Sequence, residues 1–317
     1  MQEPFPSESD IKEGISLICA VKNRNENLNK ALGTWIKNPD INEIVIVDWD
    51  SDEPIGEVVE KYQDGRITLA HVPNQPKWVL TWAYNLAARL TSYSKILKLD
   101  ADILLSNDFF KKCELTPASF LAGNWRNMKS EDEKHISGQM FLYRDDFFSI
   151  NGFDERITTY GYDEEDLYDR LEMGIEKILK ERKNFLRYRW TSRIRLRKVL
   201  PPALREKYAK FFLKCQQEKQ IKRKNKHKYE RKDIPMTCLK HLTHSNDTRV
   251  AYQDVDPNKL IEEAKLNRFK VTEPWNKQYE MKQFEISKLD ENTLLCRMKD
   301  STSTSLHYLD QKQTVAV

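Results

Sequence analysis

The sequence predicts an α/β protein in which a mostly parallel central sheet is flanked by helices. Short apolar runs of strand length alternate along the first third of the chain with segments whose apolar side chains recur at helical spacing. Such alternation is typical of strands joined by crossover helices, and strands joined in this way run parallel. Polar clusters follow three of the apolar runs, as expected where ligands collect beyond the carboxyl ends of parallel strands.

The individual elements are predicted from the length and spacing of the apolar residues. Within the run 136–143, Gly138 is expected to allow a close approach of the backbone to another group. The predicted strands cover residues 14–21, 42–47, 67–72, 95–105, 120–125 and 136–143, and 235–239 is strand-like. The predicted helices cover 25–35, 55–62, 76–90, 109–115, the segment that starts at residue 163, and 257–269.

The composition favours a soluble protein with one sizeable hydrophobic core. Hydrophobic residues make up 39% and charged residues 32% of the 317. No window approaches the ~20 apolar residues of a membrane span, and residues 1–10 are too polar and acidic for a signal peptide. The scattered cysteines predict reduced, mostly buried thiols in a cytoplasmic protein, with a truncated luminal enzyme as the alternative. They are Cys19, Cys113, Cys215, Cys238 and Cys296.

Charge is distributed unevenly along the chain. The net charge is +4, yet residues 176–232 carry 22 Lys and Arg against 5 Glu and no Asp. Aromatic residues lie among the basic ones, and Pro201 and Pro202 divide the segment into two helical pieces. We expect this basic insertion to contact an anionic membrane surface or an anionic acceptor. A solvated helical hairpin packed on the body is the alternative, and nucleic acid is not expected as a partner.

Two carboxylates, Asp100 and Asp102, interrupt the apolar run 95–105. Residues two apart on an extended chain point to the same side. Two anions held together away from water repel each other unless a cation lies between them, and oxygen ligands suit Mg²⁺ or Mn²⁺. The plain alternative is that the strand ends here and both aspartates are solvated in the following turn.

Three polar clusters are expected to converge at one edge of the sheet. Residues 22–24, 48–52 and 100–102 each follow a predicted strand directly. Because the carboxyl ends of parallel strands meet at the same edge, these clusters should form one binding face. The alternative is that polar loops simply begin where strands end.

Acidic and histidine residues further along the chain are the remaining candidates. Asp163, Glu164, Glu165 and Asp166 occupy the start of a predicted helix, where the positive end of the helix dipole favours anions. Capping explains one of these acids, and four exceed what capping needs. His241 and His244 lie three residues apart, a spacing compatible with a metal ligand.

Together these segments resemble GT-A glycosyltransferases that use nucleotide sugars, of the inverting type that is family 2-like and β-1,4-galactosyltransferase-like. Residues 20–24 with Leu28 resemble the galactosyltransferase start, and 47–51 resemble the family 2 Val-Asp-Asp-Gly-Ser loop. Residues 100–102 match the Asp-x-Asp motif, and 151–155 followed by 161–171 resemble the Asn-Gly-Phe and Glu-Asp elements. Residues 244–247 are similar to the His-Ser-x-Asp element.

The resemblance implies a set of site residues. The expected base of the transfer reaction is Glu164, because Leu167 and Arg170 then stay in register; the neighbouring acids remain rivals, and a shift by two residues would select 165–166. The expected catalytic group is thus Glu164, Asp163 or Asp166. The expected nucleotide-sugar contacts are Val21, Lys22, Arg24, Asp48, Asp50, Asp100, Ala101 and Asp102, and the expected ligands of Mn²⁺ or Mg²⁺ are Asp100, Asp102 and His244.

The expected organisation follows from these assignments. Residues 11–175 form the catalytic core, 176–234 the basic insertion, 235–275 the return to the core, and 276–317 a C-terminal extension whose part beyond Asp290 is loosely held.

The expected function is metal-dependent, inverting transfer of a hexose (galactose, glucose or an N-acetyl form) from a UDP-sugar to a glycan or lipid-linked glycan, giving a β-linkage. A nucleotidyltransferase would place paired aspartates similarly, but no glycine-rich loop follows the first strand. A non-enzymatic membrane- or nucleic-acid-binding scaffold rests on the basic insertion alone.

Overall fold

The computed structural model describes residues 5–123, 136–159, 161–173, 229–242, 263, 266–267 and 281–299. Several predictions fall outside these ranges. They concern His244, Cys215, the part of the basic insertion up to residue 228, and most of the helix predicted at 257–269.

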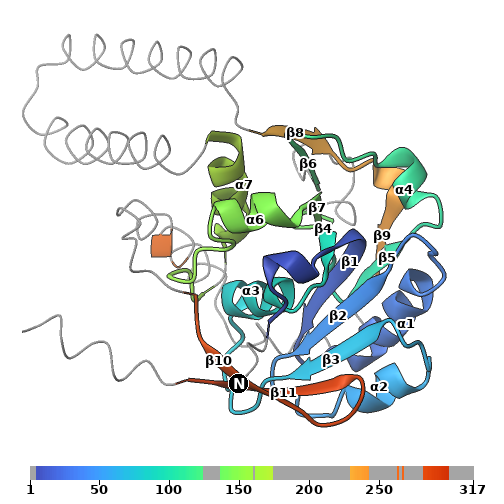
Figure 1. The fold of residues 1–317 in the computed structure, drawn as a ribbon, viewed down its shortest axis with the longest axis vertical. Coiled ribbons are helices and arrows are strands. Elements are labelled where there is room, and N and C mark those ends of the chain that lie inside the picture. Colours follow the sequence, from blue (N-terminus) through green and yellow to red (C-terminus); the bar gives the residue numbers. More distant parts are fainter. Residues whose placement is uncertain are drawn as a thin grey trace, which may run out of the picture.

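A nine-stranded sheet forms the centre of the molecule, in the order β10-β11-β3-β2-β1-β4-β7-β6-β8 (Figure 1). The strands from β11 to β4 run parallel to one another, whereas β7 pairs antiparallel with both β4 and β6. A mixed α/β architecture with a largely parallel centre is therefore confirmed. The strand bounds are β1 Lys12–Val21, β2 Glu43–Asp48, β3 Ile67–His71, β4 Tyr93–Lys98, β6 Ser119–Ala122, β7 Met140–Tyr143, β8 Glu230–Asp233, β10 Phe284–Lys288 and β11 Thr293–Met298.

Helices cover both faces of the sheet (Figure 1). One hydrophobic cluster joins α1, α2 and α4 to the sheet, and a second joins α3, α6 and α7 to the opposite face. Alternate residues of β1 supply the two clusters, Leu17 and Cys19 to the first and Ile18 and Ala20 to the second, as the two-residue period of a strand requires. The bounds are α1 Asn25–Trp35, α2 Gly56–Glu60, α3 Leu80–Arg89, α4 Phe109–Lys112, α6 Arg144–Ser149 and α7 Asp163–Met173.

The single strand predicted at 95–105 is wrong. Strand β4 ends at Lys98, and a turn in which the Ile103 N–H donates to the Asp100 carbonyl (3.1 Å) leads into β5 (Ile103–Leu105). Strand β5 leaves the central sheet and pairs with β9 (Leu239–His241). The two aspartates thus lie in a turn between two short strands.

The expectation of a loosely held tail from Asp290 is wrong for residues 293–298, which form β11, and residues 300–317 lie outside the described ranges. Strands β10 and β11 form an antiparallel hairpin, and β11 extends the sheet by pairing parallel with β3. Cys296 is fully buried, and Phe284 packs edge-on against Trp49. Strand β11 thus packs apolar residues against the face of the sheet that α3, α6 and α7 cover.

The segment predicted as strand-like at 235–239 forms a short 3-10 turn, η4 (Met236–Cys238), before β9 begins. Its Cys238 is one of four described cysteines, and all four are buried free thiols, as expected. Within the described ranges, no helix is long and apolar enough to cross a membrane.

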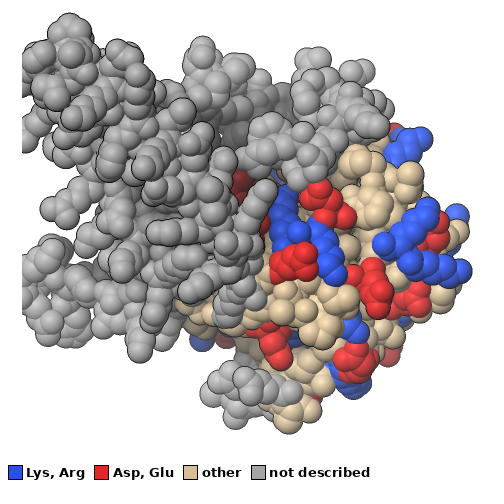
Figure 2. Space-filling view, turned by 90° about the horizontal axis from the view of Figure 1, so that it is seen from above, with Lys and Arg blue, Asp and Glu red and all other residues tan. Residues whose placement is uncertain are grey.

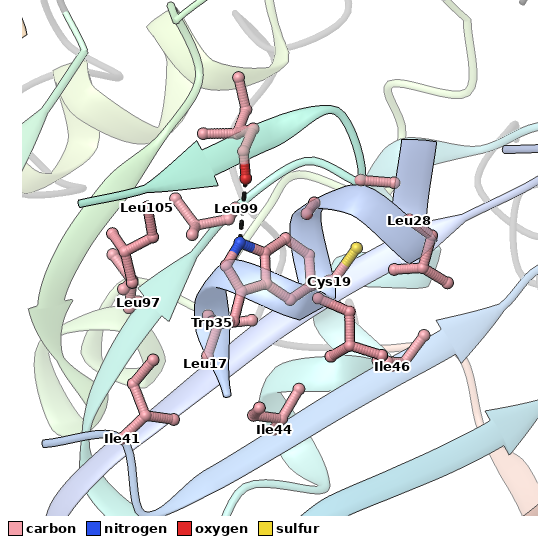
Figure 3. Packing of buried hydrophobic residues seen from close by; sticks show 14 of the residues in the cluster. Leu17, Cys19, Leu28, Trp35, Ile41, Ile44, Ile46, Leu97, Leu99 and Leu105 are labelled. Carbon is pink, nitrogen blue, oxygen red and sulfur yellow. Dashed lines mark hydrogen bonds between the residues drawn. The ribbon is translucent and has the colours of Figure 1, made fainter. Parts of the chain in front are cut away.

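Trp35 lies at the centre of the first hydrophobic cluster, at the end of α1 (Figure 3). Its side chain is fully buried, and its indole N–H donates to the carbonyl of Ile103 in β5 (2.9 Å). A second bond from the same helix, between the Leu105 N–H and the Thr34 hydroxyl (3.0 Å), also holds β5. Helix α1 therefore fixes the strand that follows Asp102.

Glu155 joins segments that lie far apart in the sequence. Its carboxylate accepts hydrogen bonds from the side-chain amide of Asn85 in α3 (2.9 Å) and from the backbone N–H of Lys282 (2.7 Å). Its carbonyl accepts a bond from the indole of Trp82 (2.9 Å). Burial raises the pKa of Glu155 to about 7, although the hydrogen bonds oppose the rise.

Replacing Trp35 by Phe should lower the free energy of unfolding by about 1–3 kcal/mol, because the buried carbonyl of Ile103 loses its donor. Urea unfolding followed by fluorescence measures the change. The matched control is Trp78→Phe, since Trp78 is only partly buried. An equal effect in both variants would contradict the role assigned to the indole hydrogen bond.

The free energy of unfolding should carry a component that falls as the pH rises from about 4.5 to about 7. Between these values the folded protein holds the Glu155 proton that the unfolded chain, with its ordinary pKa of 4.5, has released. The full shift corresponds to about 3 kcal/mol at most. Urea unfolding at several pH values should show a flatter dependence for Glu155→Gln, whereas the exposed Glu57→Gln should match the wild type.

Candidate functional site at the carboxyl edge of the sheet

The loops after β1 and β2 are bound together at the carboxyl edge of the sheet, as predicted. The Lys22 ammonium donates to the backbone carbonyls of Trp49 (3.1 Å), Asp50 and Gln75 (3.0 Å). The Asn23 N–H donates to the Ser51 hydroxyl (2.9 Å). Lys22 therefore fastens the loops that follow β1, β2 and β3 to one another.

Two residues of these loops adopt left-handed backbone conformations. Asn23 has φ +56° and Asp50 has φ +59°. Asn and Asp tolerate this region better than other residues with a side chain, because the short polar group bonds locally. The amide of Asn23 also bonds across to the loop after β2, where it donates to the Asp52 carboxylate (2.9 Å) and accepts from the Asp52 N–H (2.7 Å).

The carboxylates of Asp48 and Asp50 form hydrogen bonds to groups within the protein. Asp48 is buried; one of its oxygens lies 3.0 Å from Nδ1 of His71 in β3, and the other accepts the Ser51 N–H (3.0 Å). Asp50 accepts the Gln75 N–H (2.8 Å). Both predicted residues thus shape the loop, and the half-buried His71 lies beside them at the same edge. Sequence reasoning missed His71, although the end of a predicted strand marked its position.

Asp100 is held by side chains from three elements. The hydroxyl of Tyr84 in α3 donates to Oδ1 (2.7 Å), and the ammonium of Lys98 donates to the same oxygen (2.9 Å). The amide of Gln139 donates to Oδ2 (2.6 Å) and accepts the Asp100 N–H (2.8 Å). Burial raises the pKa of Asp100, but the Lys98 ammonium and these hydrogen bonds outweigh burial and hold it below its usual range.

Asp102 lies beside His241. Pairing of β5 with β9 places His241 Nε2 3.5 Å from Asp102 Oδ2, and the Leu242 N–H donates to the Asp102 carbonyl (2.8 Å). A partly exposed carboxylate and an imidazole at this separation are a donor pair that Mn²⁺ accepts, so the residues present fit such an ion. In the described part of the chain no third Asp, Glu, His or Cys completes a cluster. The sequence named His241 together with His244 as a candidate ligand, whereas the resemblance selected His244, which lies outside the described residues.

Glu164 approaches the same cluster from α7. Its Oε1 lies 3.7 Å from the Lys98 ammonium. A Cβ on Gly138, which has φ +93°, would come within 2.7 Å of that oxygen, so a side chain there would displace Glu164. The close approach expected at Gly138 is therefore confirmed.

The acids on either side of Glu164 are placed differently. Asp163 is buried, and burial followed by the neighbouring Glu164 carboxylate raises its pKa well above the usual range. Asp166 is fully buried in an ion pair with Arg170 (2.8 Å), and Arg170 also donates to the Ile150 carbonyl (2.5 Å). Of the three predicted acids, Glu164 is the one that lies partly exposed beside Lys98 and Asp100.

Two of the other predicted contacts, Val21 and Ala101, are buried, 1% and 5% exposed, and the Val21 carbonyl accepts the Trp49 N–H (2.8 Å). Arg24 begins α1 as its N-cap residue. Over the face shown in Figure 2, acidic and basic side chains of the described surface lie next to one another.

Two family profiles match the chain. Glycosyl transferase family 2 matches residues 16–114, which span β1 to α4, and the profile described as the N-terminal domain of galactosyltransferase matches residues 120–187. No curated protein matches the chain.

Three similar solved structures come from two enzymes. Mannosyltransferase PcManGT from Pyrobaculum calidifontis, in complex with GDP-Man and Mn²⁺, is 15% identical with a TM-score of 0.41, and the match covers 54% of this chain and 56% of that chain. The catalytic domain of Drosophila β1,4-galactosyltransferase 7 with xylobiose is 10% identical with a TM-score of 0.49, covering 92% and 98%. A mutant of that enzyme with manganese, UDP-Gal and xylobiose is 11% identical with a TM-score of 0.48, also covering 92% and 98%.

The sheet with its flanking helices and the two profile matches define a nucleotide-sugar glycosyltransferase with the GT-A fold. The two profiles match consecutive parts of the chain, the family 2 part before the galactosyltransferase part. This protein is accordingly a family 2-like, β-1,4-galactosyltransferase-like glycosyltransferase.

Proposed function

We propose that the protein is a metal-dependent, inverting hexosyltransferase that moves a sugar from UDP to a hydroxyl of a glycan or glycolipid. The observation that carries the proposal is the meeting of two acidic elements from distant parts of the chain. Lys98 contacts both Asp100, at the end of β4, and Glu164, in α7. Asp100, the acid expected on the nucleotide side, and Glu164, the candidate base, thus belong to one site.

The metal would be held by Asp102 and His241, with His244 and Asp100 as the further ligands that the sequence suggests. A Mn²⁺ or Mg²⁺ ion there supplies Lewis-acid stabilisation of the charge that accumulates on the leaving diphosphate. Asp100 already accepts hydrogen bonds from Lys98, Tyr84 and Gln139, so we expect it to contribute less to binding the metal than Asp102.

Glu164 takes the role of general base. It accepts the proton of the acceptor hydroxyl at a carboxylate oxygen as that hydroxyl attacks the anomeric carbon. Such assistance contributes about 10²–10⁴-fold to the rate. Direct displacement of this kind inverts the anomeric centre, so that an α-linked donor gives a β-linked product. The partial exposure of Glu164, against the burial of Asp163 and Asp166, supports this choice.

The nucleotide would bind over the loops after β1 and β2. The Lys22 ammonium donates to three carbonyls, so its main effect is to hold these loops in place, and Arg24 is the better phosphate contact. Asp48 and Asp50 would form the surface on which the base and ribose bind, together with the adjoining residues Val21 and Ala101.

The proposals for the acceptor and for the cellular location are based on the sequence. A basic insertion at 176–232 suits an anionic membrane surface, where a lipid-linked glycan would be presented at the cytoplasmic face. The four domains at 11–175, 176–234, 235–275 and 276–317 are proposed with the change that β8 of the second and β10 and β11 of the last belong to the central sheet.

Glu164→Gln and Asp102→Asn should each fold normally and lose transfer by about 10²-fold or more, because one removes the base and the other a metal ligand. Transfer assays with melting curves measure both properties. Glu165→Gln, at the next position of the same helix and also partly exposed, is the matched control and should retain transfer. Loss of transfer in Glu165→Gln with retention in Glu164→Gln would reverse the assignment.

UDP should bind in the presence of Mn²⁺ and bind at least about tenfold more weakly in EDTA, because the diphosphate then loses the cation that neutralises it. Isothermal titration with UDP, GDP and CDP measures the preference. A panel of UDP-hexoses, followed by their slow hydrolysis, then selects the sugar. Equal binding of UDP with and without the metal would contradict metal dependence.

A further inference from the structure

Lys98 is a lysine that the proposed mechanism does not use. It lies near the end of β4 with an exposed fraction of 0%, between the buried apolar residues Leu97 and Leu99. Burying an ammonium is costly unless charged partners surround it. Its partners therefore indicate why the chain keeps a charge at this position.

The ammonium of Lys98 has partners from three elements. Asp100 Oδ1 lies 2.9 Å away, the ring centroid of Tyr84 lies 4.5 Å away, and Glu164 Oε1 lies 3.7 Å away. The carboxylates of Asp100 and Glu164 are the charged partners that this buried ammonium has among the described residues. One buried cation thus lies between the acid at the end of β4 and the candidate base.

Pairing with Asp100 alone does not account for this geometry. Tyr84 and Gln139 already donate to both oxygens of Asp100. The chain also keeps room for the second contact, since a Cβ on Gly138 would come within 3.5 Å of the Lys98 nitrogen and 2.7 Å of Glu164 Oε1. A glycine with φ +93° therefore lies where the side chains of β4 and α7 meet.

We propose that Lys98 is a positioning residue for transfer: its buried ammonium draws the Glu164 carboxylate towards Asp100 and so orients the base relative to the metal-side acids. Lys98 has no exposed surface and does not touch the sugar or the acceptor. The contact to Glu164 is longer than that to Asp100, so Glu164 is oriented while one oxygen stays available for the incoming proton. This proposal rests on the function proposed for Glu164.

The chemistry of the base explains why orientation matters. Proton transfer requires the carboxylate oxygen within hydrogen-bond reach of the acceptor hydroxyl. Without the ammonium, Glu164 would be repelled by Asp100 and would lose its nearest described cation. The rate of the chemical step should then fall, while the nucleotide loops held by Lys22 stay in place.

The variant that tests this is Lys98→Gln, whose amide can still donate to Asp100 but carries no charge. We expect kcat to fall about 10- to 100-fold, within the range that positioned base catalysis provides, with the KM for the donor changed less than about threefold. The matched control is Lys95→Gln, on the same strand but paired with Glu13 away from the site. It should keep the wild-type kcat.

A double-mutant cycle separates positioning from a plain structural role. If Lys98 acts through Glu164, Lys98→Gln should lower the residual transfer of Glu164→Gln by less than about twofold, because the group it orients is already gone. Equal loss in both backgrounds, or a change in KM alone, would overturn the proposal.

The contact can also be tested without any sugar. The wild type, Lys98→Gln, Glu164→Gln and the double variant are each unfolded in urea. Lys98→Gln should lower the urea midpoint less in the Glu164→Gln background than in the wild type. Equal shifts would overturn the contact even if no substrate were found. An inactive wild type with coupled midpoints would refute the proposed function but leave the Lys98–Glu164 contact supported. Should Lys98→Gln fail to fold, Gly138→Ala offers a second variant, which displaces Glu164 while keeping the charge and should lower kcat similarly.

Discussion

The site depends on how one partly exposed carboxylate is held. Asp100 follows β4 in a turn, and Tyr84, Lys98 and Gln139 donate to it from α3, β4 and the segment before β7. These hydrogen bonds and the ion pair with Lys98 hold the carboxylate at the carboxyl edge of the sheet. Because the partners come from different elements, the ion pair and hydrogen bonds also fix where α3 and β7 lie relative to the end of β4.

Placement of the two chemical groups follows from this arrangement. The turn that carries Asp100 sends the chain into β5, and pairing with β9 then brings His241 to Asp102. On the other side, Lys98 reaches Glu164 at the start of α7. Asp102 and His241, the candidate metal ligands, and Glu164, the candidate base, are thus both placed by contacts that involve residues 98–102.

Local signals predicted most of the elements. Apolar runs located β1, β2 and β3, and the spacing of Leu28, Leu32 and Trp35 gave α1 its observed bounds. The predictions failed where the decision was not local. The run 95–105 is apolar enough for one strand, yet Asp100 and Asp102 need a turn, and β5 finds its partner about 135 residues later in β9. Strand β11 contains an apolar run, but it was not predicted because polar residues flank it.

Sequence alone determined the family resemblance, the class of chemistry and the candidate acids, because Asp100, Asp102 and Glu164 lie in short motifs whose spacing is local. The tertiary structure distinguished the candidate acids by their surroundings. Burial and an ion pair to Arg170 occupy Asp166, desolvation raises the pKa of Asp163, and the proximity of Lys98 distinguishes Glu164. It also brought His241 and Lys98 into the site. Exposure and charge partners arise from contacts between distant segments, and no local pattern of residues records them.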